Sequence, residues 1–199
     1  MLRKIKRKYN MEKIFLLHAA ARSGKNTCAD VMKDYYINTY HKRVLIIAFA
    51  DYVKFVLDKY YNTPAERTEE YRSRIQQFAT EQVRSSNVNY WADVVSDLLV
   101  AIQEDWDIVI IPDWRFGNER VALISRFHEF GIPIKTMLVD RPDIEEVDGM
   151  TKEQRAHSSE RNLDNYQNFD YNVINETSQI QKTIQQLIDI IDKEEKEND

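Results

Sequence analysis

The segment KIFLLHAAARSGKNT, residues 13–27, places an apolar run directly before a Ser-Gly-Lys turn. The run KIFLLH (Lys13–His18) has the length and composition of a buried β-strand. The residues after Lys25 predict an α-helix, because apolar side chains recur there at helical spacing, at Cys28, Val31, Met32 and Tyr35. A strand, a glycine-containing turn and a helix in this order predict the first unit of a parallel α/β sheet.

The turn nearly matches a phosphate-binding loop, whose pattern is a glycine, four residues, then Gly-Lys and Ser or Thr. Ala19 stands at the first glycine position, Asn26 stands where the hydroxyl is expected, and Thr27 follows one position late. The start of the helix offers backbone N–H groups to an anion, Gly24 allows close approach, and Lys25 adds a positive charge. Because Ala19 is small, the loop tolerates it if the local backbone suits a residue with a Cβ. The motif alone leaves open a Gly-Lys that merely starts a helix.

Composition limits the class of protein. A chain of 199 residues with 43% hydrophobic and 31% charged residues predicts one soluble globular domain. A net charge of −5 argues against a dedicated nucleic-acid binder, and no apolar run approaches the ~20 residues that span a membrane. Cys28 is the single cysteine, which excludes an intramolecular disulfide and favours a cytoplasmic location.

The first ten residues, MLRKIKRKYN, are basic and lack the apolar core of a signal peptide. We expect residues 1–10 to be a disordered tail, with contact to a phosphate-rich partner as the alternative. Residues 11–199 are then the single folded domain.

Four further apolar segments predict strands, at residues 42–50, 107–112, 134–140 and 171–175. Helices are expected between and after them, at residues 51–61, 68–84, 91–103, 118–131 and 180–191. Strands that are apolar without alternation are covered on both faces, and strands that alternate with helices pair in parallel. The predicted fold is therefore α/β, a three-layer α/β/α arrangement around a mainly parallel five-stranded sheet. The charged segment 141–162 is expected to form a mobile lid.

Helical spacing also predicts which side chains face inward. In the helix at 51–61 these are Val53, Val56, Leu57 and Tyr60. In the helix at 91–103 they are Trp91, Val94, Val95, Leu98 and Ile102.

Charged residues follow two of these strands. Asp113 ends a buried strand, where a carboxylate can hold Mg²⁺ directly or through water, and Arg115 can point into the same cleft. The alternative for Asp113 is a cap on the helix that follows it. Phe49 and Asp51 lie near the carboxyl end of the second strand, the edge at which open α/β sheets bind ligands, and Lys54 follows one turn later.

A polar stripe at helical spacing lies opposite the apolar face of the helix at 68–84, at Arg74, Gln77, Glu81 and Arg84. A solvent-exposed face is one interpretation, and contact with a phosphate and a base edge is the other. For Trp91, core packing is favoured over stacking on a base.

Taken together, these motifs resemble the deoxynucleoside monophosphate kinases of the bacteriophage type, a branch of the P-loop kinases. RSGKNT (22–27) resembles that family's Arg-Ser-Gly-Lys-Asp-Thr, and FADYVK (49–54) resembles its Phe-Ala-Asp-x-x-Lys. RIQQFATEQVR (74–84), with Tyr-Trp soon after, resembles its helix of spaced Arg, Gln, Thr-Glu and Arg. DWRFGNE (113–119) and HSSERNLDNY (157–166) resemble two later motifs. The five motifs occur in the family's order.

The resemblance implies transfer of the γ-phosphoryl group of ATP to a deoxynucleoside 5′-monophosphate, with Mg²⁺ and in a homodimer. The implied ATP-binding residues are Arg22, Ser23, Gly24, Lys25, Asn26 and Thr27, of which Lys25, with Asp113 and Arg115, would be catalytic. The implied metal ligands are Asn26, Thr27 and Asp113. The implied monophosphate site comprises Phe49, Asp51, Lys54, Arg74, Gln77, Arg84 and Trp91, and the lid residues are Arg155 and Arg161.

Two departures from the family pattern leave other functions open. Ala19 replaces a glycine, and Asn26 replaces an Asp. Position 26 therefore keeps an oxygen that can ligate a metal but loses the negative charge of a carboxylate. The alternatives are a P-loop kinase of another small phosphate ester and a non-catalytic nucleotide-binding module.

Overall fold

The computed structural model describes residues 11–61, 68–143, 162–163 and 165–197. The basic segment 1–10 and nearly all of the segment expected to form a lid lie outside these ranges. Among the described residues, no helix is long and apolar enough to cross a bilayer.

The core of the fold is a five-stranded, all-parallel sheet in the order β2-β3-β1-β4-β5. The strands are β1 (Lys13–His18), β2 (Val44–Ile46), β3 (Ile108–Ile111), β4 (Ile134–Asp140) and β5 (Tyr171–Ile174). This confirms the predicted fold class and strand number, although β2 is shorter than its apolar segment. Because β1 and β3 are neighbours whose following helices lie on opposite faces, the carboxyl ends of these two strands form the switch point at which such sheets bind ligands.

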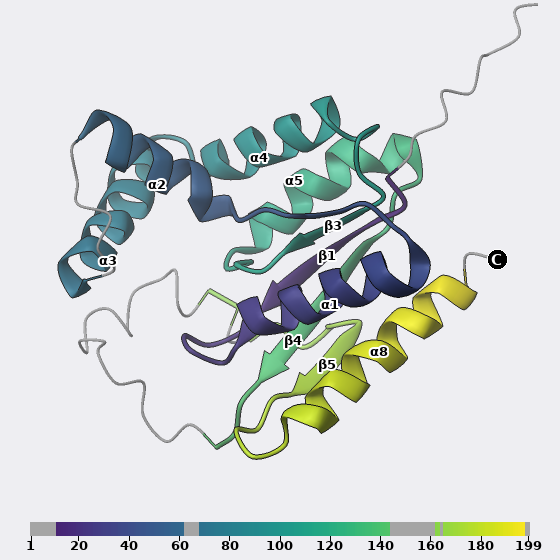
Figure 1. The fold of residues 1–199 in the computed structure, drawn as a ribbon. Helices are drawn as coiled ribbons and strands as arrows, with labels where there is room; N and C mark the ends of the chain where they lie inside the picture. The colour runs from purple at the N-terminus through teal and green to yellow at the C-terminus, as the bar shows by residue number, and fades with distance from the viewer. Residues whose placement is uncertain (1–10, 62–67, 144–161, 164, 198–199) are drawn as a thin grey trace, which may run out of the picture.

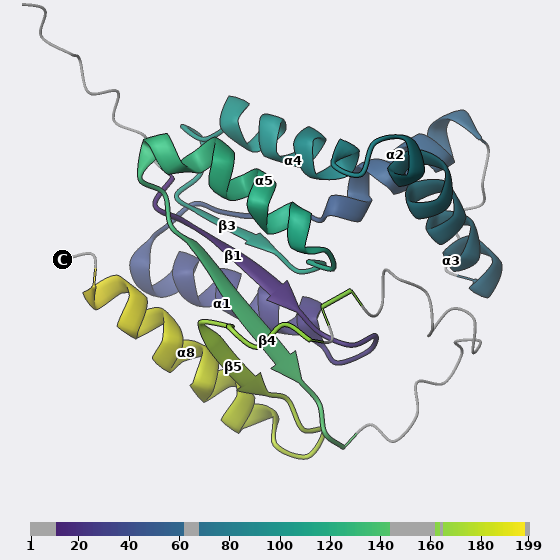
Figure 2. The same ribbon diagram turned by 180° about the vertical axis from the view of Figure 1, so that it is seen from behind.

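Helices cover both faces of the sheet. α1 (Lys25–Tyr40) and α8 (Ile180–Lys196) lie on one face (Figure 1), and α4 (Tyr90–Ala101) and α5 (Gly117–Phe127) lie on the other (Figure 2). Alternate side chains of β1 enter two separate cores, Phe15 and Leu17 on the α1 side and Ile14 and Leu16 on the α5 side. Both faces need apolar side chains, which is why the strand sequences do not alternate.

Beyond the carboxyl end of the sheet lies a helical group, α2 (Phe49–Tyr60), α3 (Glu69–Gln76) and the π-helix η1 (Gln77–Arg84), shown in Figure 1. Its core is small and consists of Val53, Leu57 and Trp91 with partly buried neighbours from α3 and η1. The remaining short element is the 3₁₀ turn η2 (His128–Phe130), which follows α5 and ends at Gly131.

Two inward-facing predictions for these helices are wrong. Tyr60 is 70% exposed, because it is the last residue of α2 and extends past the side chains that pack on Trp91. Leu98 is exposed and Leu99 is buried, because α4 packs through the face that carries Val95 and Leu99.

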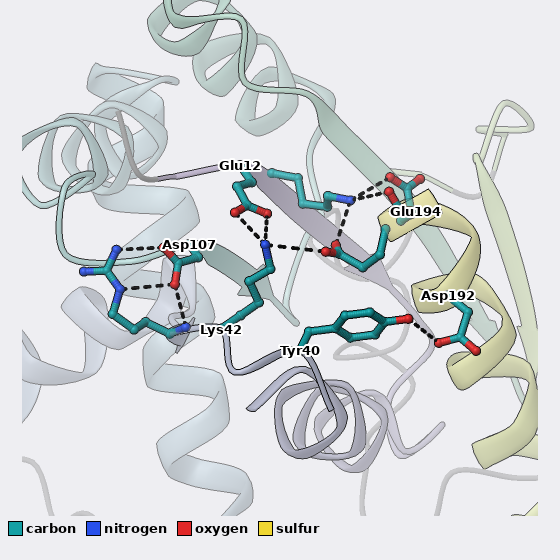
Figure 3. A network of polar contacts seen from close by, with 9 residues as sticks. Glu12, Tyr40, Lys42, Asp107, Asp192 and Glu194 are labelled. Atoms are coloured by element: carbon teal, nitrogen blue, oxygen red, sulfur yellow. Dashed lines mark hydrogen bonds and ion pairs between the residues drawn. The ribbon is translucent and has the colours of Figure 1, made fainter. Parts of the chain in front are cut away.

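At the opposite, amino end of the sheet, buried charges hold α8 against the strands (Figure 3). The Nζ of Lys13 is fully buried and lies 3.2 Å from the Glu194 carboxylate and 3.3 Å from that of Glu195. Lys42 Nζ contacts Glu12 at 2.6 Å and Glu195 at 3.5 Å. Each buried charge has an opposite partner, as burial requires, and this group therefore serves the fold rather than the ligand edge.

Candidate functional site

The phosphate-loop pattern has two glycine positions, and the loop between β1 and α1 needs glycine at only one of them. Gly24, just before α1, has φ +81°, in the left-handed region that favours glycine. Positive φ among the other described non-glycine residues occurs at Arg22 and His41, so Ala19 has an ordinary backbone. The methyl group of Ala19 packs at the edge of a core cluster. The missing first glycine therefore does not prevent the loop from forming.

Residues from the ends of β4 and β5 hold this loop in place. Asn175 Nδ2 donates to the Ser23 carbonyl at 2.8 Å, and Arg141 Nη1 donates to the Arg22 carbonyl at 3.2 Å. Thr183 in α8 donates to the Asn175 amide oxygen at 3.4 Å. These supporting residues do not belong to any of the motifs in the sequence. The position of Arg141 and Asn175 in the sequence was the available signal. They directly follow Asp140 and Ile174, which end parallel strands at the same edge of the sheet as the loop.

A cavity of about 940 Å³ opens at the carboxyl ends of β1 and β3. Its volume lies in the range of small-molecule sites. Its wall brings together most of the residues that the sequence analysis singled out, namely Arg22, Lys25, Asn26, Phe49, Asp51, Lys54, Arg84, Trp91, Asp113 and Arg115. Ser23, Gly24, Thr27, Arg74 and Gln77 are not part of the wall. Arg155 and Arg161 lie outside the described residues.

Asp113 links the end of β3 to the start of α2. Its two carboxylate oxygens accept hydrogen bonds from the backbone N–H groups of Phe49, at 2.8 Å, and Ala50, at 2.9 Å. Burial raises the pKa of the Asp113 carboxyl, against the effect of these two donors and of the nearby cations. The helix that Asp113 caps is α2, which precedes it in the chain, rather than α5, which follows it.

Glu119 and Arg84 form a buried ion pair on the same wall. Arg84 Nη2 lies 2.5 Å from Glu119 Oε1, and the guanidinium lies 4.0 Å above the Phe116 ring. The other Glu119 oxygen accepts from the N–H groups of Arg115 and Phe116. Burial raises the pKa of Glu119 to about 7, although Arg84 and the backbone donors favour the charged form. The pair joins η1 to the turn that carries Arg115.

The two ends of the cavity differ in chemistry. Near the start of α1 the wall carries Arg22 and Lys25, and Arg115 also lines the cavity. Near α3 and η1 it carries apolar and aromatic side chains, Val53, Tyr71, Ile75, Ala79 and Trp91, together with charged and polar ones, Glu69, Arg72, Gln76, Thr80 and Arg84. Lys54 and Asp51 lie on the wall between α1 and α3 and contact each other at 3.1 Å. Cationic side chains suit phosphate groups, and apolar side chains suit a flat ring.

The carboxylates on the wall do not gather into a ready-made metal site. No group of three or more His, Cys, Asp or Glu side chains within the described ranges is placed to hold a metal ion by itself. Asn26 and Asp113 nevertheless line the same cavity, and each offers an oxygen. Mg²⁺ commonly takes one or two protein oxygens and fills its other positions with water and substrate phosphates. The donor set therefore fits Mg²⁺ that arrives with a nucleotide.

Comparisons with known proteins support the fold. No protein-family model matches the chain, and no curated protein matches its sequence. A point mutant of the APS kinase CysC of Mycobacterium tuberculosis aligns with a TM-score of 0.50 and 11% identity, over 92% of this chain and 98% of that one. An unliganded sugar kinase from a Janibacter species aligns with a TM-score of 0.51 and 11% identity, over 91% and 95%. At this identity the likeness concerns the fold alone, a parallel α/β sheet with helices on both faces.

Proposed function

We propose that this chain is an ATP-dependent deoxynucleoside monophosphate kinase, which transfers the γ-phosphoryl group of ATP to the monophosphate. One observation carries the proposal. A single cavity is lined by Lys25 at the start of α1, by Asp113 and Arg115, and by side chains of α2, α3 and η1. Phosphoryl transfer between two nucleotides needs this arrangement, because both phosphate chains must meet in line within one site.

The residues of this chain have defined tasks in that reaction. The backbone N–H groups at the start of α1, together with Lys25, bind the phosphates of ATP. Arg115 offers positive charge at the place where the two phosphate chains approach. Asn26 and Asp113 are the residues to hold Mg²⁺, which when bound offsets negative charge on the phosphates. No covalent residue is required, since positioning and charge account for most of this catalysis.

The choice of a deoxynucleoside monophosphate as acceptor rests on the sequence motifs, which occur in the order of the phage-type kinases. The fold is compatible with several acceptors, since its structural neighbours include an APS kinase and a sugar kinase. The test is therefore a coupled ADP-release assay with ATP and Mg²⁺ against the common deoxy- and ribonucleoside monophosphates. Adenosine 5′-phosphosulfate and simple sugars serve as competing acceptors in the same assay.

A pair of variants ties activity to the loop. Lys25→Ala should lower turnover by about 100-fold or more while the protein stays folded, because a transition-state charge contact is lost. Lys33→Ala is the matched control, since Lys33 lies on the same helix but off the cavity wall. Equal activity of the Lys25 variant and wild type would refute the role of the loop. ATP binding by calorimetry without ADP formation from any acceptor would instead support a non-catalytic nucleotide-binding module.

A further inference from the structure

The helix from Glu69 to Arg84, which lines the cavity, changes its hydrogen-bonding pattern halfway along. α3 (Glu69–Gln76) continues directly into the eight-residue π-helix η1 (Gln77–Arg84). An α-helix turns once in about 3.6 residues, whereas the i→i+5 bonds of a π-helix widen the turn. A step of four residues is slightly more than one turn of an α-helix and slightly less than one turn of a π-helix. Side chains spaced by four therefore rotate in opposite directions around the two parts of this helix. Such a spacing therefore stays close to one face over this helix.

The residues on the cavity wall follow this spacing. Arg72, Gln76, Thr80 and Arg84 line the cavity, each four positions after the last. Gln77, which the sequence motif favoured, is exposed and is not on the wall. The π-helix thus places Gln76, instead of Gln77, on the face that lines the cavity.

Gln76 has a polar atom that the protein leaves without a partner. Its Nε2 is buried, and no atom within the described part of the chain accepts a hydrogen bond from it. A buried donor without an acceptor is costly, so such groups are rare unless a ligand or water completes them. The same cavity is lined by apolar residues that pack together, Ile75 and Ala79 from the same helix and Trp91 from α4. Apolar side chains suit the two faces of a nucleobase, and an amide suits its polar edge.

We infer that Gln76, rather than Gln77, hydrogen-bonds the edge of the acceptor base and sets base selectivity, with the Thr80 hydroxyl one position further along the same face. This inference rests on the proposed function. A primary amide held in one orientation presents a donor and an acceptor in a fixed order, and the bases differ in the order in which their pairing edges present an acceptor and a donor. Trp91 and Ile75 supply apolar surface for the faces of the base.

The test compares two neighbouring variants, Gln76→Met and Gln77→Met. Methionine keeps the side-chain length of glutamine and removes the amide. At saturating ATP, Gln76→Met should lower kcat/KM for the best monophosphate by about tenfold or more and narrow the ratio between bases, since a site built to bond a polar edge loses its bond. The KM for ATP should stay within about twofold of wild type, because Gln76 lies at the other end of the cavity. Gln77→Met should change none of these values.

A stability measurement separates recognition from a structural role. Because the Nε2 of Gln76 has no described partner in the unliganded protein, Gln76→Met should leave the urea midpoint unchanged or raise it. A lower midpoint, unchanged base selectivity, or a larger loss in Gln77→Met would overturn the inference while leaving the kinase activity in place. A wild-type protein that phosphorylates no monophosphate would overturn the proposed function together with this inference.

Discussion

Three glycines allow the rigidity of the phosphate-binding loop to be measured without any ligand. Gly24 and Gly131 both have positive φ, whereas Gly117 does not. A Cβ at Gly24 would lie 2.3 Å from Nδ2 of Asn175, whereas a Cβ at Gly131 or Gly117 would meet nothing within 4 Å. Alanine substitutions at these three positions therefore separate backbone strain from steric conflict.

The expected magnitudes follow from these contacts. Gly131→Ala carries backbone strain alone, about 1–2 kcal/mol for a non-glycine residue in the left-handed region. Gly24→Ala adds displacement of Asn175, which breaks its hydrogen bond to the Ser23 carbonyl, a further loss of about 1–2 kcal/mol. We expect about 2–4 kcal/mol in total. Gly117→Ala should be neutral or stabilising by up to about 1 kcal/mol, since it restricts the unfolded chain.

The assay is urea unfolding of each variant, followed by a double-mutant cycle with Asn175→Ala. Once the Asn175 side chain is removed, Gly24→Ala should cost only its backbone strain, so the double variant should be more stable than the sum of the single effects predicts by about 1 kcal/mol. Additive effects in the cycle, or equal losses at Gly24 and Gly131, would refute the conclusion that Asn175 holds the loop.

Three further predictions concern the Glu119–Arg84 ion pair, the metal site and the core. The pKa of Glu119 is about 7 in the folded protein and about 4.5 when unfolded, so its contribution to stability should decline as the pH rises between these values. The urea midpoint of Glu119→Gln should therefore fall less than that of wild type between pH 5 and 8. An equal fall in both proteins would contradict the raised pKa of Glu119. Asn26→Asp should lower the Mg²⁺ concentration for half-maximal activity, because it adds a charged ligand, and an unchanged Mg²⁺ titration would count against Asn26 as a ligand. Leu99→Ala should destabilise the protein by about 2–5 kcal/mol and Leu98→Ala by less than about 1 kcal/mol, because Leu99 is the buried one of the two. Comparable shifts in the thermal melting temperature would contradict the packing of α4 through the face that carries Leu99.

Patterns of local sequence were sufficient to predict the sheet. β1 and β4 have the predicted bounds, Lys13–His18 and Ile134–Asp140, because strands covered on both faces form continuous apolar runs. β2 ends at Ile46, earlier than its apolar segment suggests, because α2 already begins at Phe49. The backbone N–H groups that this early start leaves unpaired are met by Asp113, 64 residues away, and nothing local in the sequence reveals that partner.

The register of the helix that follows Glu69 could not be predicted in the same way. Helical spacing assumes about 3.6 residues per turn, and on that basis Arg74 and Gln77 share a face with Arg84. The π-helical turns from Gln77 onward change the spacing, so that Gln76 reaches the wall instead. Widened turns depend on tertiary packing and leave little trace in composition. For this reason the sequence identifies the helix of the acceptor site more reliably than its individual side chains.

The cap that Asp113 provides to α2, instead of to the helix that follows it, is compatible with the proposed role as a metal ligand. Each carboxylate oxygen accepts one backbone N–H from the start of α2, and each has a second lone pair. Asp113 can therefore keep α2 in position while its remaining lone pairs accept a metal-bound water. The same carboxylate fixes the start of α2, which carries Asp51 and Lys54. Asp113 would therefore position both a metal and an acceptor that binds to α2. This alignment requires a carboxylate rather than an amide, because Asn at this position could accept only one of the two N–H bonds.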